Sequence, residues 1–297
     1  MISKIMECKK VSIVLPVYNG AEYVAQSIES VIAQTYQNWE LIIVNDCSTD
    51  GTLEICNEFA QKDERIKVIT NTNNLKLPNS LNVGFELATG DYFTWTSDDN
   101  MYRPEAIERL VNALIEDVEL VMVYSDYTDI DSKGKDIGQE KLQDPEYLVT
   151  YNVCGPCFLY TAEIAKHVGG YDANLFLAED YDYWIRIYRY GRIKHIGDDL
   201  YLYRRHNDSL SETRKSLIQQ QTYKVLEKNF LTLYSDAQKH KMTYLFFNHM
   251  VKKSMECETE TKNMLMAINK GYAIYLKIRQ IKKTLKGIIN GSIYNTY

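Results

Sequence analysis

Short apolar segments with the composition of β-strands alternate with amphipathic helical segments in the first part of the chain, and this alternation restricts the fold more than any other feature. Strands are expected at Val11–Val17, Leu41–Val44, Ile66–Ile69, Tyr92–Ser97 and Leu120–Tyr124. Each is rich in β-branched or aromatic residues, which suit a buried, pleated surface. Strands that alternate with helices form mostly parallel sheets covered on both faces. The sequence therefore predicts an α/β fold with a mostly parallel sheet flanked by helices.

Helical segments follow several of these strands. Apolar residues recur at helical spacing over residues 24–32, and Asn19 with Glu22 ahead of them predicts a capping box. A short helix is expected at residues 79–88. Pro104 is expected in the first turn of another helix, where its missing N–H costs nothing.

The alternation weakens after residue 130. Residues 131–153 are expected to form a loop-rich insertion, and residues 158–206 mix aromatic with charged residues, as a substrate-facing region does. The chain is then expected to be helical. We therefore predict one domain at residues 1–212 and a C-terminal helical region at residues 213–297.

The charge of the chain is unevenly distributed. The net charge of −6 argues against nucleic-acid binding, but residues 262–297 contain seven Lys or Arg and no acid. Ile274, Ile278 and Ile281 recur there at helical spacing, so a basic amphipathic helix is expected. Such a helix would lie on an anionic membrane, pack on the catalytic domain or join two subunits into a homo-oligomer. The sequence leaves these alternatives open.

Neither a signal peptide nor a run of about 18 apolar residues is evident. We therefore expect a cytoplasmic protein, with peripheral contact at the inner face of the membrane as an alternative. Six cysteines in such a chain are most simply reduced thiols. Cys154-Gly-Pro-Cys157 matches a redox dithiol in spacing, but it lies mid-chain after a loop. Two buried thiols in a turn are the favoured interpretation, and zinc binding is less favoured still.

Polar loops follow three of the expected strands. They are Tyr18–Gly20, Asn45–Thr52 and Asp98–Asn100. In parallel sheets such loops converge at the carboxyl ends of the strands, where ligands bind. The adjacent carboxylates of Asp98 and Asp99 repel each other unless a cation or hydrogen-bond donors compensate them, so they indicate a divalent-metal site.

Further motifs are spread over residues 10–210. They are Asn82, Gly84, Ala88, Gly90, Gly169–Asp172, Glu179–Asp182, Trp184 and Arg186. Together with the three loops, their order resembles glycosyltransferase family 2. That family comprises inverting enzymes with an A-type, Rossmann-like nucleotide-sugar-binding fold. Two departures stand out: Asn45-Asp46-Cys47 replaces the family's Asp-Asp-Gly, and Thr96 replaces the first Asp of its Asp-x-Asp.

The resemblance implies a set of donor-side residues. The nucleotide would contact Pro16, Val17, Tyr18, Asp46 and Asp98. Tyr18 would stack near the base, and Asp46 would accept a hydrogen bond from a ring N–H. The alternative for Tyr18 is a turn aromatic that covers the edge of the sheet.

A bound Mn²⁺ or Mg²⁺ is also implied. Its direct ligand would be Asp99, ranked above Asp98, and His206 would lie beside the metal or the diphosphate. A structural role is an equally weighted alternative for His206. Arg204 is a further candidate for neutralising the diphosphate.

The acceptor side is implied to use Asp180 as the general base, with Glu179 and Asn82 as further candidates. Glu179 and Asp180 are expected at the start of a helix, where N-capping is the alternative role. Asp182 should point elsewhere and be structural. Direct displacement assisted by one base predicts inversion at the anomeric carbon.

The sequence therefore predicts a metal-dependent inverting glycosyltransferase that moves a sugar from a nucleoside diphosphate, with UDP favoured, to an acceptor hydroxyl. The acceptor would be a glycan or lipid-linked molecule, in polysaccharide or surface-glycan synthesis. A non-catalytic sugar-nucleotide-binding protein is the alternative. A nucleotidyltransferase is disfavoured because Pro16–Gly20 is not a glycine- and Arg-rich phosphate loop.

Overall fold

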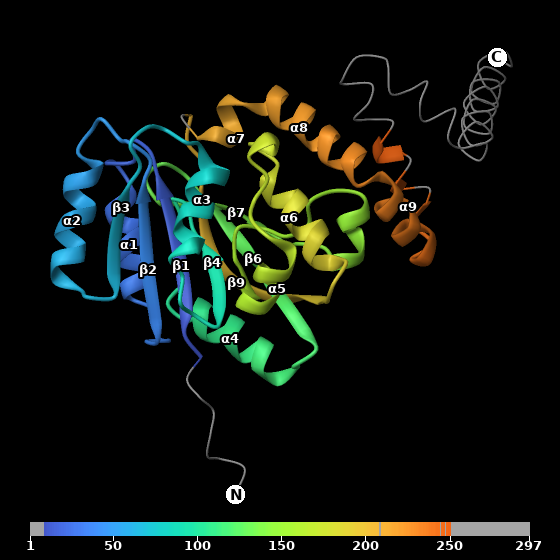
Figure 1. Ribbon diagram of the computed structural model, residues 1–297, viewed down its shortest axis with the longest axis horizontal. Coiled ribbons are helices and arrows are strands. Elements are labelled where there is room, and N and C mark those ends of the chain that lie inside the picture. Colours follow the sequence, from blue (N-terminus) through green and yellow to red (C-terminus); the bar gives the residue numbers. More distant parts are fainter. Residues whose placement is uncertain (1–8, 208, 244, 247, 251–297) are drawn as a thin grey trace, which may run out of the picture.

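A computed structural model describes residues 9–207, 209–243, 245–246 and 248–250 (Figure 1). One sheet runs through this part of the chain in the order β3-β2-β1-β4-β8-β6-β9-β5, and β7 pairs with β6. The strands are β1 Val11–Val17, β2 Trp39–Asn45, β3 Ile66–Thr70, β4 Tyr92–Trp95, β5 Met101–Tyr102, β6 Leu120–Ile130, β7 Asp136–Glu140, β8 Phe158–Thr161 and β9 Arg192–Arg204.

Helices cover the sheet on both faces. They are α1 Val24–Ile32, α2 Thr52–Lys62, α3 Leu77–Glu86, α4 Ala106–Glu116, α5 Ala162–Val168, α6 Glu179–Tyr188, α7 Leu210–Thr213, α8 Lys215–Lys228 and α9 Phe230–Lys239. Two short 3-10 helices, η1 Pro145–Val149 and η2 Ala173–Leu175, lie between them. The α/β fold with flanking helices agrees with the prediction.

The sheet has a parallel half and a mixed half. Strands β3, β2, β1 and β4 are parallel, and the register pairs Val17 with Asn45. The loops after β1 and β2 therefore leave the sheet at the same edge. Beyond β4, the strand β8 is antiparallel to both of its neighbours, whereas β9 is parallel to β6. The expected parallel arrangement therefore holds for the half formed by β3, β2, β1 and β4, and the other half is mixed.

Two hydrophobic cores lie on opposite faces of the sheet. Because side chains alternate along a strand, β1 contributes Val14 to one core and Ile13 to the other. Val14 shares its core with Leu81 of α3 and Trp184 of α6, whereas Ile13 packs with Ile28 of α1 and with α2 and α4. Figure 1 shows α3 and α6 on the near side of the sheet.

α1 covers the predicted residues 24–32, but the predicted capping box and the predicted place of Pro104 are wrong. No capping box forms, because α1 begins at Val24 and has no side-chain cap. Asn19 instead adopts a positive φ of 54°, and its Oδ1 accepts a hydrogen bond from Thr49 N at 2.8 Å, which ties the β1–α1 loop to the β2–α2 loop. Pro104 precedes α4, which begins at Ala106. Local capping was overridden by contacts between loops.

The segment at residues 131–153, expected to be loop-rich, contains β7 and η1. The helices expected after residue 213 occur as α8 and α9, and they join the core of α6: Tyr223, Leu226 and Leu233 are buried in it. In the described part of the chain, no helix has the length and apolarity that a membrane span requires. The predicted basic amphipathic helix lies outside the described residues.

Candidate functional site

The loops after β1, β2 and β3 are joined through Asp46. Asp46 is 4% exposed, and its backbone N–H donates to Val17 O at 2.8 Å. Its carboxylate accepts hydrogen bonds from Asn71 Nδ2, from Leu75 N and from Lys76 N, at 2.8 to 2.9 Å. Asp46 follows the last residue of β2 and therefore fixes the conformation of the segment before α3 through these hydrogen bonds.

Three further predicted nucleotide contacts lie at the end of β1 or directly after it. Pro16 and Val17 are buried at the end of the strand, where they pair with β2, whereas Tyr18 is 49% exposed. An aromatic ring in this position is free to stack on a planar ligand. The structure thus places Tyr18 and Asp46 at the ends of neighbouring strands.

The side chain of Asp98 packs against Gly20 in the β1–α1 loop. A Cβ atom on Gly20 would lie 1.9 Å from Asp98 Oδ2, so only glycine leaves room for this carboxylate. Ser27 Oγ also donates to Ser97 O at 2.9 Å, which joins α1 to the same turn. Burial raises the pKa of Asp98 to about 8, and the charge of Asp99 adds to the effect.

Asp99 lies between β4 and β5, and its side chain faces His206, which follows β9. The distance between Asp99 Oδ2 and His206 Nε2 is 3.0 Å. Within the described part of the chain, Asp99 Oδ1 is buried and has no hydrogen-bond partner. Buried carboxylate oxygens normally have partners, so this atom is suited to a ligand from outside the chain. A divalent cation fits, because carboxylate oxygen and imidazole nitrogen both ligate such ions.

A cation held here would need more ligands than the chain offers. In the described ranges, no group of three or more His, Cys, Asp or Glu side chains is arranged to hold a metal ion. The remaining ligands would then come from water or from the phosphates of a substrate, as Mg²⁺ commonly takes them.

Arg204 holds loops together. It is 1% exposed, and its guanidinium donates to backbone carbonyls of Asp99, Asp131 and Ser132 and to Gln26 Oε1. These bonds engage each of its three nitrogens and give Arg204 a role in positioning the loops, and its predicted contact with a diphosphate stays a prediction. Gln26, which no sequence pattern singles out, lies in the first turn of α1.

Asn82 fixes the Gly169–Asp172 loop. Its side chain donates to Tyr171 O at 2.9 Å and accepts from Tyr171 N at 2.7 Å. Trp95, at the end of β4, donates from Nε1 to Tyr171 Oη at 3.1 Å, and the Tyr171 ring stacks on Tyr183 of α6 with centroids 4.0 Å apart. Asn82 thus helps to connect the end of β4 with α6 and takes a positioning role.

Asp180 lies in the first turn of α6. Its Oδ1 accepts from Tyr181 N at 2.7 Å, and its Oδ2 accepts from Asn152 Nδ2 at 2.9 Å. Burial raises the pKa of Asp180 and, with the charge of Asp180, raises that of Glu179 to about 8. The helix N-cap is Ala178, so neither acid is the cap residue. Asn152 was missed by sequence analysis because no local pattern distinguishes it from other loop residues.

The thiols of Cys154 and Cys157 are free and buried. Burial raises the pKa of both, and that of Cys157 reaches about 12. A reactive redox dithiol needs the opposite shift and exposure to solvent. The redox alternative is therefore not supported.

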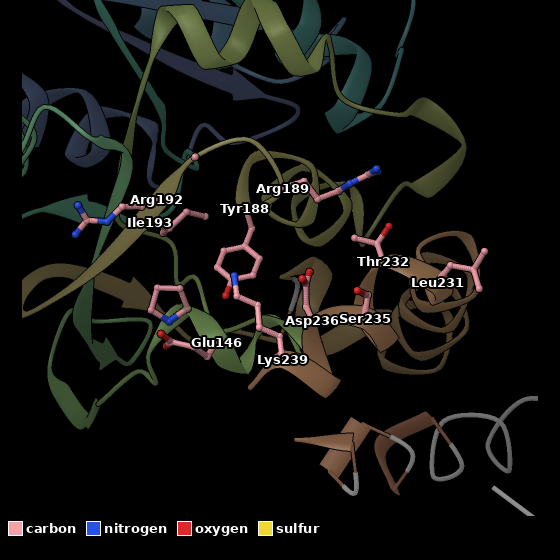
Figure 2. Close-up of a pocket in the computed structure, with 12 residues that line it drawn as sticks. Glu146, Tyr188, Arg189, Arg192, Ile193, Leu231, Thr232, Ser235, Asp236 and Lys239 are labelled. Atoms are coloured by element: carbon pink, nitrogen blue, oxygen red, sulfur yellow. The ribbon is translucent and has the colours of Figure 1, made fainter. Parts of the chain in front are cut away.

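A groove of about 740 Å³ lies at the other end of α6 (Figure 2). Its lining comes from the end of α6, the start of β9, η1 and α9, and includes Tyr188, Arg192 and Asp236. None of the predicted site residues lines it. The candidate site is instead the set of loops at the carboxyl edge of the parallel strands.

Comparison with solved structures supports this fold. The structure is similar to that of S. aureus TarS residues 1–349 in complex with UDP-GlcNAc, with a TM-score of 0.64 and 19% identity over 81% of this chain and 72% of that one. It is also similar to the mannosyltransferase PcManGT from Pyrobaculum calidifontis in complex with GDP-Man and Mn²⁺, with a TM-score of 0.62 and 16% identity over 97% and 87% of the two chains.

Curated relatives are similar over most of the chain. An uncharacterized glycosyltransferase of Rickettsia typhi is 33% identical over 232 residues, which are 74% of this chain and 71% of that protein. The glycosyltransferase GlyG of Streptococcus pneumoniae is 29% identical over 224 residues, 70% of this chain and 74% of the relative. Residues 12–169 match the family described as Glycosyl transferase family 2. The chain is therefore a glycosyltransferase and belongs to glycosyltransferase family 2.

Proposed function

We propose that this enzyme transfers a sugar from a UDP donor to an acceptor hydroxyl with inversion at the anomeric carbon, and that it uses Mn²⁺ or Mg²⁺. The observation that carries the proposal is the buried, unpartnered Oδ1 of Asp99 beside His206, at the edge of the sheet where nucleotides bind in such folds. The family and the fold agree with this assignment.

Asp99 and His206 are the proposed metal-binding residues. A bound divalent cation would neutralise the negative charge that develops on the departing diphosphate. Arg204 holds the backbone of this turn in place. Its Nε donates to Asp99 O, and its backbone N–H donates to Asn100 Oδ1 at 2.8 Å. PcManGT, a structural neighbour, was solved with Mn²⁺, which favours manganese as the first ion to test.

The nucleotide is proposed to bind along the ends of β1 and β2. Its base would stack beside Tyr18, with Pro16 and Val17 lining the slot through their backbone. A carboxylate has about four acceptor positions, and three internal donors occupy Asp46, so one position remains for a ring N–H of the base. Asp98 would lie near the ribose and the phosphates. The TarS complex with UDP-GlcNAc favours uridine as the base.

Asp180 is the proposed general base. The acceptor O–H gives its proton to Asp180 while the acceptor oxygen forms a bond to the anomeric carbon. The bond between that carbon and the diphosphate oxygen breaks on the opposite side, and its electron pair leaves with the nucleoside diphosphate. Because the attack and the departure are on opposite faces, the configuration inverts. Burial of Asp180 raises its pKa and so makes it a stronger base than an exposed aspartate.

The acceptor is proposed to be a glycan or a lipid-linked sugar, in polysaccharide or surface-glycan synthesis at the cytoplasmic side of a membrane. Support for this setting is the resemblance to the family. Glu179 would assist Asp180 from the same helix turn, since its Oε2 accepts from Leu177 N at 2.6 Å and holds the turn in place.

Thermal denaturation of the full chain tests this proposal. UDP, UDP-GlcNAc, UDP-glucose and GDP-mannose would each be added with Mn²⁺ or with EDTA. A ligand that binds the folded form raises the melting temperature, by several degrees at about 100 times its Kd. We expect stabilisation by the UDP compounds with Mn²⁺. Stabilisation by GDP-mannose alone would contradict the assignment to UDP, and equal stabilisation in EDTA would contradict the metal.

A further inference from the structure

Asn152 touches the proposed base from a different part of the chain. It lies in the loop between η1 and β8, and its Nδ2 donates to Asp180 Oδ2 at 2.9 Å. The orientation of the amide follows from this contact, because an ionised carboxylate only accepts hydrogen bonds and therefore faces the NH₂ group. The amide oxygen is then directed away from Asp180.

Asn152 Oδ1 is buried and, among the residues that the structure describes, finds no hydrogen-bond partner. A buried amide oxygen without a partner costs free energy, so an external donor would stabilise it. It belongs to the same amide group as the nitrogen that donates to Asp180, so one side chain carries both the donor to Asp180 and this acceptor.

The loop that carries Asn152 is held firmly against α6. Tyr181, the residue after Asp180, donates from its hydroxyl to Leu148 O at 2.7 Å. Val153 and Cys154, which follow Asn152, are 1% and 5% exposed. Contacts on both sides thus limit the movement of Asn152 relative to Asp180, as a binding site requires.

We propose that Asn152 binds the acceptor: its Nδ2 holds Asp180 in place, and its Oδ1 accepts a hydrogen bond from the hydroxyl next to the one that attacks the donor. This inference rests on the proposed function of Asp180. It assigns the acceptor to a chemical class, a sugar with two neighbouring hydroxyls, of which Asp180 takes the proton of one and Asn152 binds the other.

The hydrogen bond also affects the proton affinity of Asp180. Donation from Asn152 lowers the pKa of Asp180 and so opposes the effect of burial. The other titratable groups that influence this region are Glu179 on the same helix, Cys154 on the loop and Tyr171 on the Gly169–Asp172 loop. Loss of the amide should therefore move the acidic limb of the rate profile to higher pH.

Asn152→Ala in the full chain tests the proposal. Transfer would be measured with the nucleotide sugar selected by thermal denaturation, and with methyl hexopyranosides and their monodeoxy forms as acceptors. We expect the KM for the acceptor to rise about tenfold, as for one lost hydrogen bond, with the KM for the donor within about twofold. The deoxy form that lacks the neighbouring hydroxyl should be a poorer acceptor for the unmodified enzyme but not for Asn152→Ala.

Hydrolysis of the donor by water provides a readout that needs no sugar acceptor. Its acidic limb should shift upward in Asn152→Ala and less in Asn152→Gln, which keeps the amide. The matched control is Asn174→Ala, because Asn174 Nδ2 binds Asp172 Oδ1 at 3.0 Å in an exposed pair outside the site. It should change neither the acceptor KM nor the pH profile.

An unchanged acceptor KM together with an unchanged acidic limb in Asn152→Ala would overturn this inference. Should the alanine variant fail to fold, the same two measurements on Asn152→Gln and Asn152→Ser decide. Failure of the proposed function has a different result: Asp180→Asn would then retain transfer, whatever the Asn152 variants do.

Discussion

Lys228 of α8 reaches a carboxylate that is fully buried in α6: its Nζ lies 3.0 Å from Asp182 Oδ1, and Asp182 is 0% exposed. Arg186 Nε and Asn229 Nδ2 also donate to this carboxylate, at 2.9 and 3.1 Å. The C-terminal helices are therefore joined to the helix that carries Asp180, and Asp182 has the structural role that its position in the sequence indicates.

Replacement of Asp182 should destabilise the protein. Asp182→Ala leaves Arg186, Lys228 and Asn229 without the buried carboxylate that they share, so we expect the free energy of unfolding to fall by roughly 3 kcal/mol. Urea denaturation followed by circular dichroism measures this change. The control is Asp172→Ala, which removes the more exposed partner of Lys228 and should cost about 1 kcal/mol or less. Equal losses in the two variants would argue against the buried cluster.

Glu40 should make stability depend on pH in the acidic range. Burial opposes its ionisation, yet hydrogen bonds from Ser12, Thr89 and Lys10 lower its pKa from 4.5 to about 2. A lowered pKa stabilises the folded state above pH 4.5, and this contribution is lost as the pH falls toward 2. It amounts to about 3 kcal/mol at neutral pH.

Glu40→Gln tests this origin of the pH dependence. The variant should be less stable than the parent at pH 7, and the difference should shrink as the pH falls from 4.5 toward 2. Urea denaturation at several pH values measures it. A difference that stays constant over this range would show that the charge of Glu40 is not responsible.

Loss of the proposed metal ligands should remove the dependence of transfer on metal. We expect Asp99→Asn and His206→Ala each to lower kcat about 100-fold or more, because roughly 3 kcal/mol of charge stabilisation is lost. EDTA should have a similar effect on the unmodified enzyme. Titration of activity with Mn²⁺ measures the change.

A second His–Asp pair provides the control for this experiment. His195 Nε2 lies 2.6 Å from Asp126 Oδ1, between β9 and β6 and outside the candidate site. His195→Ala should leave the Mn²⁺ dependence unchanged. If it reduces that dependence as much as His206→Ala does, the effect is one of folding and the assignment of His206 is wrong.

Asp180→Asn should separate catalysis from binding. An amide of the same size does not accept the acceptor proton, so kcat should fall by about 10²- to 10⁴-fold while the nucleotide still raises the melting temperature. Unchanged turnover would refute the assignment of the base. In the unmodified enzyme, burial raises the pKa of Asp180, so activity should decline on acidification at a higher pH than for an exposed aspartate.

Thiol labelling should distinguish Cys47 from the buried cysteines. Cys47 is partly exposed, whereas Cys154 and Cys157 are buried and have raised pKa values. A thiol reagent should therefore modify Cys47 before Cys154 and Cys157 in the folded protein, and peptide mass spectrometry locates the label. Rapid labelling of Cys154 would restore the redox alternative. Denaturation in urea is the control and should make all three react.

The positions of the first strands could be predicted because a strand buried on both faces needs a continuous apolar segment, and that requirement is local. The later strands were missed or shortened. β6 continues to Ile130 through polar residues, of which Ser125 and Asp126 are buried, and β7 consists of exposed residues, so neither segment has the continuous apolar pattern of a buried strand. The family was also recognisable from the sequence, since its motifs are short segments in a constant order.

Side-chain partners that are distant in sequence were decided by the tertiary structure alone. Asp99 and His206 are 107 residues apart, Asn82 and Tyr171 are 89 apart, and Asn152 and Asp180 are 28 apart. The sequence identified the acids that bring chemistry to the site, because charge at the end of an apolar strand is a local pattern. Which donor each acid faces, and which oxygen remains without one, depends on how the loops pack, and no local pattern encodes that.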